Sequence, residues 1–140
     1  MWETFVKHKN IESIMHDKGL AKVGDNLVNF CYSLAKSLVL GYTTGEKVRD
    51  SVLARAIRLT SIYHHMNRRA DAGRAADAYE AIMAYLWMKE KISISDIVTS
   101  LSDTLTIDKT TSRKKEGDIA AESFRKLLED NIRHLPSDNE

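Results

Sequence analysis

The chain has 140 residues, of which 43% are hydrophobic and 29% charged, as in an ordinary globular domain. Its formal net charge of +1 excludes a global electrostatic attraction to nucleic acid. The single cysteine, Cys31, excludes an internal disulfide and a cysteine metal cluster. The apolar runs are too short for a membrane span, and no signal peptide is evident, so we expect a cytoplasmic protein.

Apolar residues recur at helical spacing along most of the chain, and no segment alternates with the period of a strand. The pattern predicts a first helix over residues 2–17, a second over 20–40, and a third capped by Thr44 that reaches Tyr63. A fourth helix is expected over about 71–89, and a short fifth one begins at a cap on Ser93 or Ser95.

Residues 108–117 are polar throughout and predict a mobile loop or linker, which is followed by a last helix over about 118–135. We expect the tail, 136–140, to be disordered. The fold class predicted is therefore all-α, a single bundle of about six or seven helices over residues 1–135.

Two acids three residues apart are the most informative feature of the fourth helix. Asp77 and Glu80 lie on the same helical face, among small and apolar residues that indicate a mostly buried helix. Buried acids need a cation, which can be a metal ion or an arginine such as Arg74 or Arg69. The residues by themselves leave both possibilities open.

The second helix carries Gly24 followed by Asp25. A glycine inside a helix costs about 1 kcal/mol relative to alanine, and its expected use is the close approach of another helix or of a ligand. If Asp25 faces the fourth helix, it forms a cluster of three carboxylates with Asp77 and Glu80, and such oxygen ligands suit magnesium or manganese.

Gly24-Asp25 in one apolar helix, with the later motif Ala76-Asp77-Ala78-Tyr79-Glu80-Ala81-Ile82, resembles the catalytic domain of the ribonuclease III family. Residues 45–54 and Arg74 are similar to that family as well, and the resemblance covers about Leu20 to Trp87. It implies an all-helical homodimer that cuts double-stranded RNA with Mg²⁺, or Mn²⁺, and leaves 5′-phosphate and 3′-hydroxyl ends. Asp25, Asp77 and Glu80 match its metal ligands, with Asp25 and Glu80 as catalytic residues.

The sequence departs from the family pattern at two positions. The family has a further catalytic glutamate one turn before the Gly-Asp aspartate, where this chain has Ala21, and an acid another turn earlier, where it has Lys18. The short Mini-III subgroup has a similar Leu-Ala-x-hydrophobic-Gly-Asp stretch, so activity is compatible with Ala21.

Basic side chains near these motifs are candidates for binding RNA phosphates. We predict this role for Arg49, Arg55, Arg74 and Lys22, and the alternative for each is a solvated surface position.

The leading hypothesis is a small magnesium-dependent endoribonuclease that acts on structured or double-stranded RNA. A second is a non-catalytic dimer of the same fold that binds RNA or the ribosome. A third is an all-α nucleotide pyrophosphohydrolase, which needs a second pair of acids that the sequence does not show.

Overall fold

A computed structural model describes residues 1–67 and 69–136. Within these residues there are six α-helices, three short 3₁₀ helices and no strand, which confirms the all-α prediction. The α-helices are α1 (Ile11–Met15), α2 (Lys18–Leu40), α3 (Asp50–Arg58), α4 (Ala72–Met88), α5 (Ile94–Thr104) and α6 (Arg113–Asn131). The 3₁₀ helices are η1 (Glu3–Phe5), η2 (Tyr63–His65) and η3 (Ile132–His134).

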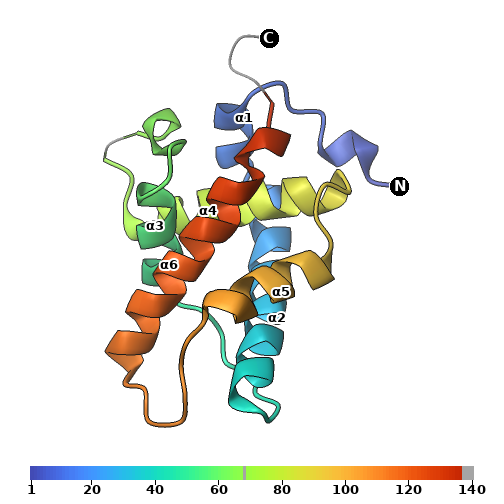
Figure 1. The fold of residues 1–140 in the computed structure, drawn as a ribbon. Coiled ribbons are helices and arrows are strands. Elements are labelled where there is room, and N and C mark those ends of the chain that lie inside the picture. Colours follow the sequence, from blue (N-terminus) through green and yellow to red (C-terminus); the bar gives the residue numbers. More distant parts are fainter. Residues whose placement is uncertain (68, 137–140) are drawn as a thin grey trace.

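Helix α4 is the centre of the bundle. It packs against α1, α2 and α3 and crosses behind α6 (Figure 1). Its alanines allow this close packing, because a methyl side chain is small enough for neighbouring helices to approach the α4 backbone. Ala75, Ala76, Ala78, Ala81 and Ala84 are all fully buried.

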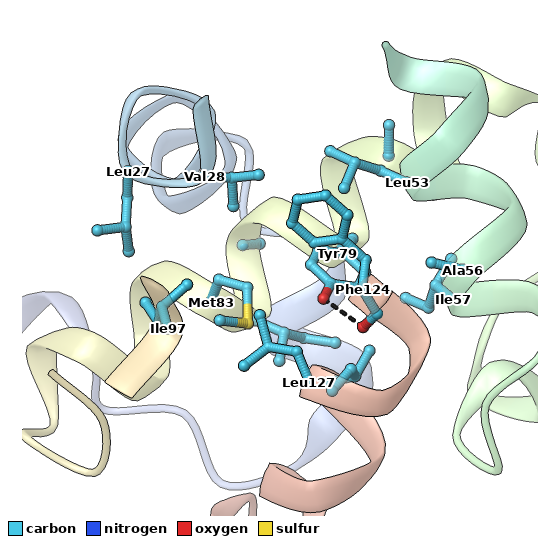
Figure 2. Packing of buried hydrophobic residues seen from close by; sticks show 14 of the residues in the cluster. Leu27, Val28, Leu53, Ala56, Ile57, Tyr79, Met83, Ile97, Phe124 and Leu127 are labelled. Atoms are coloured by element: carbon cyan, nitrogen blue, oxygen red, sulfur yellow. Dashed lines mark hydrogen bonds between the residues drawn. The ribbon is translucent and has the colours of Figure 1, made fainter. Parts of the chain in front are cut away.

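Tyr79 joins α4 to α6 inside the core. Its hydroxyl donates a hydrogen bond to the Phe124 carbonyl oxygen at 2.6 Å, and the two rings meet edge to face with centroids 5.7 Å apart (Figure 2). Met83, one turn further along α4, packs with Ile97 of α5 and Leu127 of α6 in the same cluster (Figure 2). One continuous core therefore holds α4 in place on several sides.

The prediction of a single helix over residues 2–17 is wrong. The segment contains η1 and α1, and α2 already begins at Lys18. Two capping side chains explain the break: the Asn10 side chain accepts from Ser13 N–H, and that of Asp17 accepts from Leu20 N–H. Each cap favours the start of a new helix, because its side chain accepts a hydrogen bond from a first-turn backbone N–H that has no partner within that helix.

The third helix is shorter than predicted, and Thr44 is not its cap. Gly41 ends α2 in the left-handed conformation at φ 82°, and residues 42–49 then run to α3, which begins at Asp50. Side chains of α2 hold this segment, since Ser37 Oγ accepts from Thr44 N–H and Asn29 Oδ1 accepts from Val48 N–H, both at 2.9 Å. The helix ends at Arg58, which leaves Leu59 57% exposed rather than in the core.

The C-terminal part also differs from the prediction. Ser93 caps α5 as expected, whereas α6 begins at Arg113, within the polar stretch expected to be a loop. Ser112 caps α6, and Glu116 in its first turn accepts a hydrogen bond from the Tyr32 hydroxyl at 2.6 Å. Tertiary bonds of this kind stabilise a helix that apolar periodicity does not reveal. Most of the tail expected to be disordered, residues 137–140, lies outside the described residues.

The apolar residues of α2 divide between two faces. Leu20 and Leu27 are buried, but four others are exposed to between 37% and 67%: Val23, Phe30, Leu34 and Leu38. These four, called the α2 stripe below, follow one another at helical spacing along one side of α2. None of the described helices combines the length and apolar character needed to cross a bilayer.

Candidate metal centre

The crossing of α2 and α4 is closest at Gly24. A Cβ atom placed on this residue would lie 1.8 Å from the Glu80 carbonyl oxygen, a distance that no side chain can occupy. The predicted use of Gly24 for the close approach of another helix is thus confirmed. The contact also brings the next residue, Asp25, beside Glu80.

Asp25 and Glu80 form a close pair of acids. Their carboxyl groups lie close enough for Asp25 to raise the pKa of Glu80 through a side-chain hydrogen bond and through its charge. Glu80 is only 3% exposed, and its Oε2 atom receives no hydrogen bond from any donor of the described residues. An unpartnered buried carboxylate oxygen is costly, so this site is built to take up a proton or a cation.

Burial is the main cause of a raised pKa for Glu80, which reaches about 9. The hydrogen bond and the charge of Asp25 raise it further, and the charges of Asp50 and Asp77 act in the same direction. A raised pKa of this kind favours the protonated form of Glu80 at neutral pH when no cation is bound.

Asp77 lies at the exposed edge of the same cluster. Partial burial and the negative charges of Asp50 and Asp25 raise its pKa, while the ammonium group of Lys18 opposes this rise. Among the described residues, neither Asp77 nor Glu80 forms a salt bridge, so the alternative of a structural ion pair with Arg74 or Arg69 finds no support.

Sequence reasoning missed Asp50. This residue is the first of α3, and its charge raises the pKa of both Asp77 and Glu80. The prediction of a helix beginning near Thr44 placed Asp50 inside that helix and hid its position at a helix start, where acids are favoured. The sequence does contain a signal for this helix start: an acid followed by apolar residues at helical spacing from Val52 onward.

Asn29 positions Asp25. One turn after Asp25 on α2, its side-chain amide donates to Asp25 Oδ1 at 2.9 Å, and its Oδ1 accepts from Val48 N–H. The same amide thus connects the carboxylate to the segment that leads into Asp50.

The acids fit a divalent cation with few protein ligands. No group of three or more His, Cys, Asp or Glu side chains is arranged to hold a metal ion in residues 1–67 and 69–136. Only the pair Asp25–Glu80 is brought into contact, so the site with three ligands stays a prediction. Magnesium keeps several of its waters and often binds through one or two carboxylates together with substrate phosphates.

The basic residues predicted to bind RNA have different surroundings. Arg55 is paired with Asp118 at 2.6 Å, as expected for a structural role. The Arg49 guanidinium lies against Gly117 of α6 and donates to the Arg113 carbonyl oxygen at 3.4 Å. Within the described part of the chain, Lys22 and Arg74 form no side-chain hydrogen bond or ion pair and are exposed.

A family model described as ribonuclease III matches residues 18–136, a span that includes α2 to α6 and all four acids of the cluster. A search of curated protein sequences finds no match.

Proposed function

We propose, on the premise that the chain belongs to the ribonuclease III family, that it is a magnesium-dependent endoribonuclease acting on double-stranded or structured RNA. The observation that carries the proposal is the buried Glu80 carboxyl group beside Asp25, whose Oε2 atom has no hydrogen-bond partner among the described residues. A purely structural acid in such a place would have a basic partner, and none is present among the described residues.

Asp25 and Glu80 would hold the ion, and Asp77 and Asp50 would increase the negative charge around it. A bound magnesium ion polarises a phosphodiester and supplies an activated water. The protein's own contribution is to keep the two carboxyl groups together at the α2–α4 crossing and to orient Asp25 through Asn29. Manganese, with similar ligand preferences, is an alternative ion.

We also propose that the protein is a homodimer formed through the α2 stripe. Contiguous exposed apolar surface on a helix marks an interaction site. The four side chains span about 22 Å of helix, at a rise of about 1.5 Å per residue. A second copy would bury them and place two acid clusters on one particle, which suits a substrate with two strands.

The test is cleavage of a defined RNA duplex with magnesium. We expect Glu80→Gln to reduce the cleavage rate by more than about 100-fold, since losing even an outer-shell partner of a metal site typically costs 10–100-fold. Glu12→Gln, which changes an exposed acid in α1, is the matched control and should cut at the wild-type rate.

The rival function is a non-catalytic dimer that binds RNA. It is favoured by Ala21 and Lys18, which replace two acids of the family pattern, and Ala21 lines the same cavity as Asp77. Wild-type protein that binds duplex RNA but never cuts it with magnesium or manganese would establish the rival. The family match gives no support to a nucleotide pyrophosphohydrolase.

A further inference from the structure

A cavity of about 310 Å³ lies beside the acid cluster. It is bounded by the end of α1, the start of α2, the segment around Met66 and the first turns of α4. Its lining includes Lys18, Arg74 and Asp77, and we call it the Lys18 pocket. The volume is at the lower end of the range for ligand sites, about 300–1,000 Å³, and suits one nucleotide unit.

Two cations at this pocket have no hydrogen-bond or salt-bridge partner among the described residues. Neither the Lys18 ammonium nor the Arg74 guanidinium forms a hydrogen bond or a salt bridge with a described residue. Arg74 stands one turn before Asp77 on the same face of α4, and Lys18 is near enough to act on the charge of Asp77. The pocket thus presents two free positive charges next to the acids.

The remaining acid of the lining is already occupied. Asp17 accepts from Leu20 N–H at 3.0 Å through Oδ1 and contacts His8 Nε2 at 2.8 Å through Oδ2. It therefore does not compete for Lys18 or Arg74. His16 Nδ1 contacts the Glu12 carbonyl oxygen at 2.8 Å, so this nitrogen is not available to a ligand in the pocket.

The floor of the pocket is apolar. Met15, Ala21 and Ala70 are buried, and Met66 is partly buried against the core. The small side chain of Ala21 leaves space next to Asp77 that a longer side chain would fill. A ligand that fits this lining has an anionic group for the rim and a less polar part, such as a sugar or base, for the floor.

We propose that the Lys18 pocket binds one phosphate of the RNA strand next to the bond that is cut, through Lys18 and Arg74, with the attached nucleoside on the apolar floor. The proposal rests on the proposed function and specifies one subsite of its substrate. It assigns a role to Lys18, a residue that departs from the family pattern. A second divalent cation is not the expected occupant, because Lys18 and Arg74 would repel it.

The first experiment follows the backbone amides of the full-length protein by NMR during titration with adenosine 5′-monophosphate, and separately with adenosine. We expect the monophosphate to change the amide chemical shifts of Ala21, Met66 and Ala70, and adenosine to change them much less. Lys18→Ala and Arg74→Ala should abolish these shifts, and Lys18→Arg should retain them. Absence of shifts in the wild type, or shifts that persist in both alanine variants, would overturn the pocket.

The second experiment measures affinity for duplex RNA by fluorescence anisotropy in a Glu80→Gln background, which prevents cutting. We expect Lys18→Ala and Arg74→Ala each to weaken binding about tenfold and to lower the slope of log affinity against log salt by about one. Lys89→Ala is the matched control, since it removes an equal charge just beyond the other end of α4. Equal losses of RNA affinity in Lys18→Ala, Arg74→Ala and Lys89→Ala would mean that the overall charge of the protein, rather than this pocket, determines binding. That result would overturn the proposal.

The two proposals can fail separately. If the wild type cuts duplex RNA at rates independent of Lys18 and Arg74, the pocket is wrong and the enzyme proposal stands. If the wild type binds duplex RNA through Lys18 and Arg74 but never cuts it with magnesium or manganese, the pocket stands and the endoribonuclease proposal is wrong.

Discussion

At the scale of single residues, the Glu80 carboxyl group has an unusual environment, since its buried Oε2 atom has no hydrogen-bond partner among the described residues. It is buried without a basic partner among the described residues, and burial together with the neighbouring acids raises its pKa from 4.5 to about 9. In the unfolded chain the same carboxyl group is exposed to water and titrates near its ordinary value. The folded protein therefore binds a proton that the unfolded chain releases, which links stability to pH.

The sign of that link follows from the raised pKa. The contribution of protonated Glu80 to the free energy of unfolding is fully present below about pH 4.5. It is lost progressively as the pH rises through about 9. The loss has an upper limit of about 1.4 kcal/mol per pH unit. We expect metal-free Glu80→Gln protein, in which the amide imitates the protonated acid, to lose less stability than the wild type over this range. Denaturant unfolding at several pH values measures the difference.

Two additions sharpen this test. Glu12→Gln should follow the wild-type curve, because Glu12 is exposed. Magnesium should stabilise the wild type more at alkaline pH than at acid pH, since the ion and the proton compete for the same carboxyl group. Parallel curves for the wild type and Glu80→Gln would contradict the assignment.

At the scale of elements, the site depends on how closely α2 and α4 approach. The helices meet backbone to backbone at Gly24 and Glu80, and a methyl group at position 24 would overlap the Glu80 carbonyl oxygen. Since close-packed interiors do not yield easily, the helices would have to separate, and Asp25 would move away from Glu80.

Gly24→Ala should therefore destabilise the protein despite the higher helix propensity of alanine. We expect the free energy of unfolding to fall by about 1–3 kcal/mol, the range typical of overpacking. Gly45→Ala is the matched control, because a Cβ at Gly45 meets nothing within 4 Å, and the change should stay within about 0.5 kcal/mol. Chemical denaturation measures both, and equal stability of the two variants would refute the close crossing.

At the scale of the whole molecule, the α2 stripe is a row of apolar side chains that the single chain leaves uncovered. Val23, Phe30, Leu34 and Leu38 are exposed on a helix whose other face belongs to the core. Apolar side chains in such a row favour burial against a partner, at about 25 cal/mol per Å² of apolar surface removed from water. The proposed homodimer provides that partner.

Leu38→Glu should convert the dimer into a monomer at micromolar concentration, as measured by analytical ultracentrifugation. Leu38 is 67% exposed, so the folded chain tolerates a charge there, while an apolar interface does not. Leu59→Glu changes a leucine that is 57% exposed at the end of α3, outside the stripe, and should leave the dimer intact. A wild-type protein that is monomeric at all concentrations would rule the interface out.

Much of the fold follows from local patterns in the chain. The helices α2, α4 and α5 match their predicted ranges closely, because long apolar periodicity and a capping serine or aspartate are strong local signals. Local patterns do not predict the start of α6 or the course of segment 42–49, because both depend on contacts with α2. The contact is made by Tyr32 for α6 and by Asn29 for the segment. Such contacts join residues far apart in the sequence.

The candidate site divides in the same way. The sequence alone determined the pair Asp77–Glu80 on one helical face and the family to which the chain belongs, since helical spacing and a short motif are local properties. Only the tertiary structure decided that Asp25, rather than Asp77, meets Glu80, that Asp50 joins the cluster, and that Lys18 and Arg74 border one pocket. These facts depend on the crossing of α2 and α4, which is set by packing at Gly24 and by the core around Tyr79.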